Sequence, residues 1–294
     1  MVGTTRSLGA QEAQSPTRRA WQGLFYTVCI ALTIFFMAPL AWSFLTSIKP
    51  AAEVLRSPPT IWPSRIASEN YANLNRVGSG IVRYTSNSVL TSLYTIVGTI
   101  VLSTLAGYGF ARFGFVAKGA LFILVLAPLM IPFQAIMIPL FLVLRTLHLN
   151  NTLLGLACVY ITAQLPFAVF IMRNVFAAVP REIEEAALID GCSPLGMLVR
   201  VMLPIVRPGI VTVGLFAFFS SWNELFAALL YLTDSEKFTL PLLLATARTN
   251  PGLFGGTNWG GLQASVVVTM VPCMLLFIVL QRYYVSGLSS GAVK

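Results

Sequence analysis

Charged residues are scarce in this sequence, and their scarcity limits what the protein can be. Only 10% of its 294 residues are charged, whereas ordinary soluble domains carry about a quarter. Apolar residues make up 56% of the chain, and the mean hydropathy is +0.80. The net charge of +9 comes from basic residues scattered between apolar runs, so we interpret it as a membrane-topology signal and expect no nucleic-acid partner. These features exclude an ordinary soluble domain and indicate a polytopic membrane protein.

Signatures of catalysis and of metal binding are also missing. No G-x-x-x-x-G-K-[ST] sequence is present to hold phosphates, so we expect that the chain does not hydrolyse ATP and is not an enzyme. The single histidine, His148, lies in a polar turn and is expected to be solvated. The cysteines lack C-x-x-C spacing, which argues against a metal or redox site. We expect Cys29, Cys158, Cys192 and Cys273 to be free thiols.

Charge-poor apolar runs recur at about 20 residues, the length that a helix needs to cross the hydrocarbon core of a bilayer. We predict an all-α fold with six membrane-spanning helices: Trp21–Phe44, Asn87–Ala111, Gly119–Leu142, Leu153–Phe176, Gly209–Tyr231 and Leu262–Tyr284. The first run is too long for a cleaved signal peptide. The predicted domains are a polar tail at residues 1–20, a membrane domain at residues 21–285 and a second tail at residues 286–294. An even number of spans places both tails on the same side of the membrane.

A charged stretch, residues 180–208, separates the fourth and fifth predicted spans. It reads PREIEEAALIDGCSPLGMLVRVMLPIVRP. The proline and acidic residues at its start suit the beginning of a helix. Gly191 can adopt the left-handed conformation that ends a helix, and Ser193 followed by proline is typical of the cap and first turn of another. We therefore predict two short helices with a bend between them, on which Ala186 and Ala187 would let a partner approach closely.

This stretch resembles the EAA loop in the permease subunits of binding-protein-dependent ABC importers. The residues that match the loop are Glu185, Ala186, Ala187, Asp190, Gly191, Leu203 and Pro204. Their spacing is similar to that of the carbohydrate-uptake branch, exemplified by the second permease of the maltose importer. Leu198 departs from that branch, which often has phenylalanine there, but it keeps an apolar docking residue. RYTSNSV before the second span and GLSSGAVK at the end of the chain also resemble the family, so the likeness covers essentially residues 21–294.

The resemblance implies the type I ABC importer permease fold and a membrane protein without catalytic activity. In that family the EAA loop forms a coupling helix that fits a cleft on a cytoplasmic ATPase subunit. The implied partners are a second, non-identical permease, two ATP-binding cassette subunits and an extracytoplasmic sugar-binding protein. ATP and Mg²⁺ would bind to the ATPase subunits, and this chain would carry no cofactor. The implied location is the cytoplasmic membrane of a bacterium or archaeon, with several spans in contact with lipid and both termini in the cytoplasm.

Polar groups near the end of the fifth predicted span indicate a substrate path. Glu224 is the only ionisable residue placed deep in a span, where an unpaired charge is costly, so it is a functional candidate. With Trp222 and Asn223 it offers the aromatic surface and the hydrogen-bonding groups that a sugar requires. At helical spacing Ser220, Asn223, Glu224 and Ala227 would share one face. Helix packing or pairing at a gate is the alternative role for Glu224.

The third and fourth predicted spans each contain a glutamine as well as prolines. Gln134 and Gln164 are further candidates for the substrate path, with structural hydrogen bonding as the alternative. Because proline removes a backbone donor, we expect both helices to be kinked. The prolines concerned are Pro128, Pro132, Pro139 and Pro166.

Two long polar segments are expected on the outer side of the membrane. Lys49–Arg83 is rich in proline and is predicted to be an irregular, ordered loop. Thr233–Gly261 is predicted to be a shaped loop and not a seventh span. In the maltose-type family a loop at this place reaches into the sugar cleft of the binding protein. The residues here that match it in position are Thr257, Asn258, Trp259 and Gly260, and a surface loop without this role is the alternative.

Two other classes of membrane protein are alternatives to the importer. A stand-alone secondary transporter or channel would use Glu224 as its ion site, need no ATPase and lose uptake on Glu224→Gln. A structural membrane anchor would leave the kinked spans and the buried carboxylate without a role. Within the importer class, alternative cargoes to a di- or oligosaccharide are a polyol, glycerol phosphate or an amino sugar. The lack of basic residues deep inside the spans argues against a phosphate.

Overall fold

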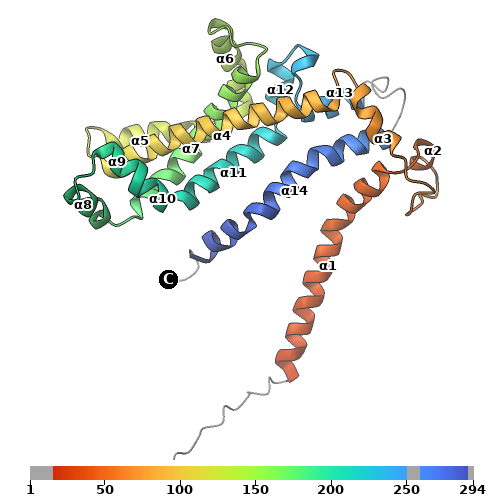
Figure 1. The fold of residues 1–294 in the computed structure, drawn as a ribbon, viewed down its shortest axis with the longest axis horizontal. Helices are drawn as coiled ribbons and strands as arrows, with labels where there is room; N and C mark the ends of the chain where they lie inside the picture. Colours follow the sequence, from red (N-terminus) through yellow and green to blue (C-terminus); the bar gives the residue numbers. More distant parts are fainter. Residues whose placement is uncertain (1–15, 250–258, 291–294) are drawn as a thin grey trace, which may run out of the picture.

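The computed structural model describes residues 16–249 and 259–290, and every regular element in these ranges is a helix (Figure 1). Four helices, α1, α4, α7 and α14, are long and apolar enough to cross a membrane, and two bent pairs bring the number to six when each pair is counted as one span. This confirms the predicted all-α membrane fold.

In chain order the elements are α1 (Pro16–Ser47), α2 (Ala51–Val54), α3 (Glu69–Ala72), η1 (Asn73–Arg76), α4 (Ile81–Arg112), α5 (Lys118–Leu126), η2 (Ala127–Met130), α6 (Phe133–Thr146), α7 (Leu153–Ala177), α8 (Arg181–Ile189), α9 (Pro194–Met197), η3 (Leu198–Met202), α10 (Leu203–Ile205), α11 (Arg207–Asn223), α12 (Phe226–Tyr231), η4 (Ser235–Lys237), α13 (Leu240–Thr249) and α14 (Trp259–Ser290).

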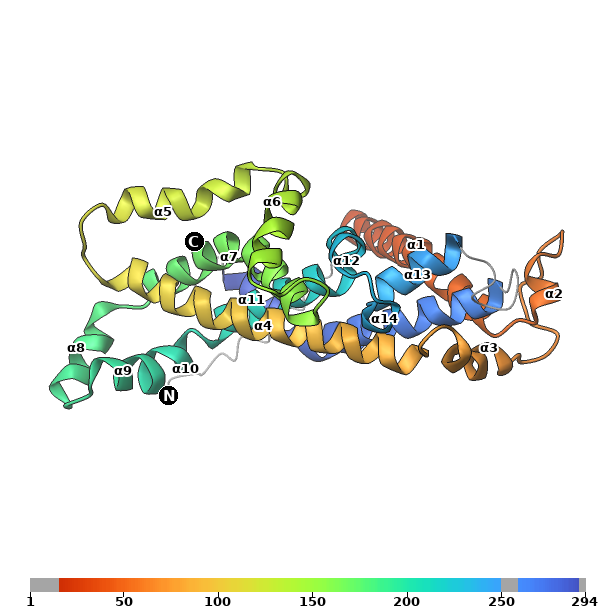
Figure 2. The ribbon, with the colours of Figure 1, turned by 90° about the horizontal axis from the view of Figure 1, so that it is seen from above.

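The helix α4 is the axis of the bundle, and it packs along α7 and α11 (Figures 1 and 2). In lipid, apolar burial adds little to helix association, so close backbone contact across small side chains becomes important. At Gly107 a Cβ atom would lie 2.9 Å from the backbone nitrogen of Arg173 in α7, so glycine is required for this approach. The buried side of α4 shows a repeat of small or polar residues: Asn87, Ser88, Thr91, Ser92, Thr95, Thr99, Ser103, Thr104 and Gly107.

The short helices lie at two opposite ends of α4 (Figures 1 and 2). At the end where α4 begins, which we call the α13 end, lie α2, α3, η1, η4 and α13. At the end where α4 finishes, which we call the α8 end, lie α8, α9 and α10. Arg83 forms an ion pair of 2.7 Å with Glu236 of η4, and Asn87 donates to the carbonyl oxygens of Glu236 and Phe238. The segments predicted on the outer side therefore lie together, opposite residues 180–208.

The third predicted span, Gly119–Leu142, is not one kinked helix. Residues Lys118–Met130 and Phe133–Thr146 form two parts that are bent by 106°. The break falls at Ile131, whose backbone is extended, immediately before Pro132. Proline supplies no N–H to a helix and disfavours the helical conformation of the residue before it. The helix α7, in contrast, continues through its internal proline without interruption.

The fifth predicted span, Gly209–Tyr231, is interrupted as well. The helix α11 ends at Asn223, and α12 begins at Phe226. At its other end α11 starts at Arg207, where it is bent by 77° from the segment Pro194–Ile205. The prediction of one continuous helix through this span is therefore wrong.

Several boundaries also differ from the predicted ones. The expected outer loop Thr233–Gly261 contains a helix of its own, α13, because Leu240, Leu242 and Leu243 are buried against the bundle. The helix α1 begins inside the predicted tail at residues 1–20, and α14 extends to Ser290, into the predicted tail at residues 286–294.

Candidate functional site

The charged stretch folds as predicted, as short helices joined by a bend. The helix α8 ends in a Schellman motif: Gly191 has φ +79°, its N–H donates to the carbonyl oxygen of Leu188, and the N–H of Cys192 donates to that of Ala187. The Ser193 hydroxyl then caps α9 by accepting from the N–H of Gly196 at 3.1 Å. These local bonds give the bend a defined geometry.

The outer surface of this stretch carries exposed apolar side chains among charged ones. Ile189 is 86% exposed and Leu195 is 70% exposed, and Leu188 and Val199 are exposed beside them. Leu188 and Ile189 lie outside every candidate membrane span, so lipid does not account for their exposure, whereas Leu195 and Val199 belong to the first part of a bent pair, Pro194–Ile205. An exposed apolar patch next to charged residues is typical of a protein interaction site.

The residues that match the EAA loop divide between the surface and the interior. Glu185, Ala186, Asp190, Gly191 and Pro204 are exposed, and Leu203 is partly buried. Ala187 and Leu198 are each only 7% exposed and pack in a cluster with Met172 and Phe176 of α7. The expectations that Ala187 offers a low docking surface and that Leu198 is a docking residue are therefore wrong, since both residues anchor the loop to α7.

A buried ion pair joins this loop to the core. Nε of Arg112, the last residue of α4, lies 2.7 Å from Oε1 of Glu184 in α8, and the two side chains are only 7% and 13% exposed. A second guanidinium nitrogen donates to the carbonyl oxygen of Val179 at 2.7 Å. The sequence signal for this pair is weak, because an arginine at the end of a span is also what membrane topology requires.

Glu224 lies in the break between α11 and α12, where its backbone is extended. Its carboxylate caps α12: Oε1 accepts from the N–H of Phe226 at 2.9 Å, and Oε2 accepts from the N–H of Ala227 at 2.9 Å. The hydroxyl of Tyr160 in α7 donates to Oε2 at 3.1 Å. The carboxylate that was expected to be alone in a span is therefore held by backbone and hydroxyl donors.

The predicted helical face is formed only in part: Ser220 and Asn223 lie in α11, whereas Glu224 and Ala227 lie beyond its end. The Gln164 side-chain amide donates to the Ser220 hydroxyl and thereby links α7 to α11. Trp222 is 1% exposed, and its indole N–H donates to the carbonyl oxygen of a residue in α14 at 3.1 Å. Its ring stabilises α11 from the interior in this conformation.

The last predicted path residue, Gln134, lies in the first turn of α6 and is exposed. Within the described part of the chain, no hydrogen bond joins it to Glu224 or Gln164.

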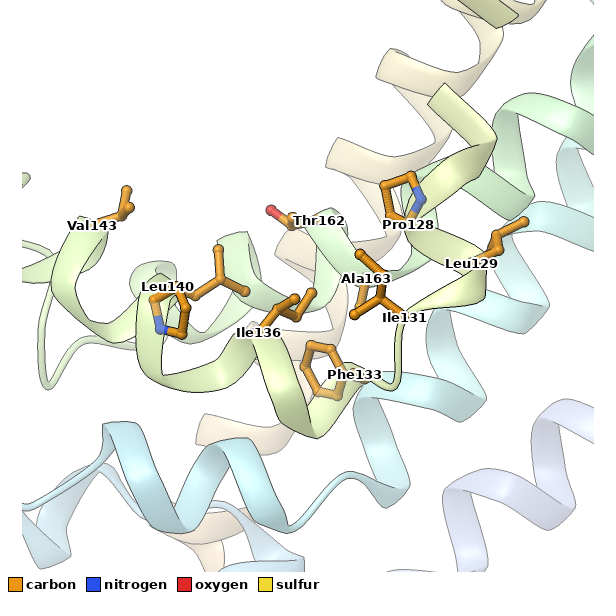
Figure 3. Close-up of a pocket in the computed structure, with 10 residues that line it drawn as sticks. Pro128, Leu129, Ile131, Phe133, Ile136, Leu140, Val143, Thr162 and Ala163 are labelled. Carbon is orange, nitrogen blue, oxygen red and sulfur yellow. The ribbon is translucent and has the colours of Figure 1, made fainter. Parts of the chain in front are cut away.

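Next to Gln134, inside the bend of the third span, is a cavity of about 480 Å³ (Figure 3). The residues around this cavity are apolar apart from Thr162, whose hydroxyl donates to the carbonyl oxygen of Cys158. The cavity therefore suits apolar surface, and the Thr162 hydroxyl is left to it only as a hydrogen-bond acceptor.

Two of the four residues proposed to meet a binding protein can be placed. Trp259 begins α14 and is 39% exposed. Gly260 is buried, and a Cβ atom there would lie 2.6 Å from Nδ2 of Asn70. Thr257 and Asn258 lie outside the described residues.

Residues 99–290 match the family of binding-protein-dependent transport system inner membrane components. The matched region includes the second part of α4, both bent pairs and the whole charged stretch at residues 180–208. The chain belongs to this family. It is therefore a multi-pass membrane component of such a transport system, and the resemblance seen in the EAA loop is confirmed.

Comparisons along the whole chain agree with this assignment. The permease is 31% identical over 276 residues to the diacetylchitobiose uptake system permease protein DasC of Streptomyces coelicolor, covering 94% of this chain and 97% of that protein. It is 33% identical over 274 residues to the arabinooligosaccharides transport system permease protein AraQ of Bacillus subtilis, covering 90% of this chain and 95% of that protein. A crystal structure of a bacterial ABC transporter involved in the import of alginate matches with a TM-score of 0.79 at 21% identity, covering 92% and 98%, which shows a shared fold.

Proposed function

We propose that this permease forms half of the translocation path of an ATP-driven importer for a di- or oligosaccharide. DasC and AraQ are named as permeases for sugar oligomers, and the spacing of the EAA loop resembles the carbohydrate-uptake branch. A second, non-identical permease would complete the path, and an extracytoplasmic binding protein would deliver the sugar. Two separate ATPase subunits would bind ATP and Mg²⁺, so that this chain converts motion and catalyses no reaction.

The observation that carries the proposal is the apolar surface at the α8 end. Ile189 and Leu188 are exposed and lie outside every candidate span, while the Schellman turn and the Arg112–Glu184 pair hold the segment that presents them. Such a surface suits insertion into a cleft of an ATPase subunit. The α8 end would then face the cytoplasm together with both termini, and the α13 end would face the binding protein.

Residues 180–208, the proposed coupling stretch, would move and thereby change the side of the membrane to which the path is open. When the ATPase subunits close on ATP, they would draw the coupling stretches of the two permeases together and open the cavity outward, and hydrolysis would return it inward. For this to drive transport, each nucleotide state must bind the outward and inward forms with different affinity. The breaks at Ile131 and Glu224 divide the third and fifth spans into parts that can move separately.

The substrate path is proposed to follow the polar groups beside these breaks. Glu224, Asn223 and Gln164 gather where α7 meets the end of α11, as the Tyr160 and Ser220 contacts show. Gln134 would join them only in another conformation or through the second permease. Trp222 would contribute by holding α11 in place.

The decisive experiment measures sugar-stimulated ATP hydrolysis by the complex reconstituted with its binding protein. Glu185→Lys and Ile189→Ser should abolish the stimulation, while Val116→Ser should not, because Val116 is equally exposed, at 94%, but lies outside the coupling stretch. Unchanged stimulation in the first two variants, or the absence of a co-purifying ATPase, would refute the proposal. Uptake that collapses with an ion gradient would instead indicate ion coupling.

A further inference from the structure

A second cavity lies at the α13 end, where α1, α2 and α14 meet (Figure 1). It has a volume of about 280 Å³, which corresponds to about nine water molecules at about 30 Å³ each. The residues that line it include Trp42 and Thr46 of α1, Lys49 just before α2, Glu53 within α2, and Trp259 and Gln263 of α14. Three separate segments thus contribute polar and aromatic groups to one small volume.

Two buried polar atoms in this cavity have no hydrogen-bond partner among the described residues. One is the hydroxyl oxygen of Thr46, whose residue is only 6% exposed, and the other is the side-chain carbonyl oxygen of Gln263. Buried polar groups are almost always hydrogen-bonded, because leaving one unpaired costs stability. A ligand in the cavity would lie beside both side chains, where a small rotation of each could bring its oxygen into contact.

Lys49 is a third buried polar residue at the cavity, and not all of its hydrogen-bond donors are used. Its residue is 2% exposed, and its ammonium group donates to the carbonyl oxygen of Thr60 and lies 4.6 Å from the centre of a Trp42 ring. It forms no ion pair within residues 16–249 and 259–290. An ammonium group has three donors, so two remain for a partner in the cavity.

These groups define the chemistry of the ligand. Gln263 requires a donor, Lys49 requires acceptors, and Thr46 can serve either way, so the ligand must both donate and accept. The carboxylate of Glu53 is already bonded to Thr60 and Ser64, and its negative charge disfavours an anion. Trp42 and Trp259, 43% and 39% exposed, add apolar ring surface. Neutral sugars combine hydroxyl groups of this kind with apolar ring faces.

We propose that this cavity binds one neutral sugar ring at the mouth of the permease. The chemistry of the ligand follows from the cavity alone, whereas its identity with a unit of the transported cargo rests on the proposed function. At the α13 end the site would receive a sugar before it enters the path beside Glu224. None of its residues belongs to the coupling stretch.

The test is a tryptophan fluorescence titration of the purified complex in phosphatidylcholine nanodiscs, with N-acetylglucosamine and L-arabinose as probes and inorganic phosphate as the anionic control. At least one sugar should give a saturable change that phosphate does not give. Thr46→Val and Gln263→Met keep the side-chain shape but remove the oxygen, and each should weaken the apparent affinity at least tenfold. Thr46→Ser keeps the hydroxyl group, so its apparent affinity should stay within about twofold of the wild-type value. A tenfold loss, in contrast, corresponds to the loss of a good contact.

Control variants separate this cavity from other tryptophans and from folding. Trp62→Phe should leave the fluorescence change intact because Trp62 does not line the cavity, whereas Trp42→Phe and Trp259→Phe should reduce it. The proposal would be overturned if Thr46→Val bound the sugar with the same apparent affinity as the wild type and had an unchanged melting temperature. A response to phosphate, or one that requires phosphatidylglycerol in the nanodisc, would also overturn it, since either would indicate an anion or headgroup site.

Separate readouts distinguish failure of this site from failure of the proposed function. If sugar-stimulated ATPase activity is normal but no cavity-dependent binding is found, only the cavity proposal fails. If no ATPase associates with the permease but Thr46→Val still weakens sugar binding, the importer proposal fails and the binding site stands.

Discussion

Arg112 at the end of α4 and Glu184 in α8 form an ion pair with an N–O distance of 2.7 Å, and it connects the axis of the bundle directly to the coupling stretch. Neither side chain has more than 13% of its surface exposed, so water screens the pair little. The same guanidinium group holds the carbonyl oxygen of Val179. Displacement of α8 therefore requires either displacement of α4 or loss of a buried charge pair.

Removal of one partner of this pair should be much worse than removal of both. Arg112→Met or Glu184→Met should each lower the free energy of unfolding by about 3 kcal/mol, because the other charge is left buried and unpaired. The double variant should recover a large part of this loss. Thermal unfolding of the purified complex and sugar-stimulated ATPase activity are the two measurements.

The exposed pair Arg65–Glu69 provides the matched control. Its side chains are 63% and 45% exposed, so water screens this pair and Arg65→Met should leave the melting temperature almost unchanged. Strictly additive effects of Arg112→Met and Glu184→Met in the double variant would show that the pair does not act as a unit.

The contact between α4 and α7 should tolerate no side chain at Gly107. Gly107→Ala places a methyl group against the backbone of α7 and should cost about 1–3 kcal/mol. Gly109→Ala, two residues along the same helix, has no atom within 4 Å of the new Cβ and should be neutral or stabilising by up to about 1 kcal/mol. The melting temperatures of the two variants in detergent check this difference, and equal values would contradict it.

Glu224 should act first as the cap of α12. Glu224→Ala removes both acceptors and should destabilise the protein by about 1 kcal/mol, as is usual for loss of a helix cap. Glu224→Gln keeps one carbonyl oxygen, so it should retain ATP-dependent uptake in the presence of an ionophore. Uptake assays in proteoliposomes, with Glu69→Gln as a carboxylate control outside the spans, measure this. Complete loss of uptake in Glu224→Gln with intact ATPase stimulation would instead favour an ion site.

The loop between α1 and α3 should weaken in acid through Glu53. Hydrogen bonds from the Ser64 backbone, the Thr60 hydroxyl and the Ser64 hydroxyl lower the pKa of Glu53 below its ordinary value of 4.5. Because the folded pKa is the lower one, this stabilisation is fully present above the ordinary value of 4.5 and is lost as the pH falls from there through the folded value. The protection of amides at residues 60–66 against hydrogen exchange, relative to the intrinsic rate at each pH, should fall over that range in the wild type. In Glu53→Gln, exchange should be faster at neutral pH and lack this dependence on pH.

Local signals predicted the coupling stretch well because its bonds are local. The left-handed Gly191 and the cap at Ser193 involve neighbours within five residues, which sequence patterns encode directly. Hydropathy likewise predicted the long spans, since the thickness of the bilayer sets their length. The third span shows the limit: the prolines indicated a bend, but only packing determines that it reaches 106°.

Contacts between distant residues could not be predicted in this way. The partner of Arg112 lies 72 positions along the chain, and that of Glu224 in α7 lies 64 positions away, at Tyr160. The burial of Ala187 and Leu198 also depends on how the stretch folds back on α7, which a motif does not specify. Residues that appear equivalent in the motif thus divide between a surface and a core.

The length of α4 has a mechanical consequence. Its 32 residues extend about 48 Å, well beyond the roughly 30 Å of the hydrocarbon core. Arg83 near one end forms an exposed ion pair with Glu236, and Arg112 at the other forms a buried one with Glu184. As a rigid lever of that length, the helix would convert a tilt of about 5° at one end into a shift of about 4 Å at the other. A small rotation at the ATPase side would thus be amplified into a displacement large enough to admit or exclude a sugar ring.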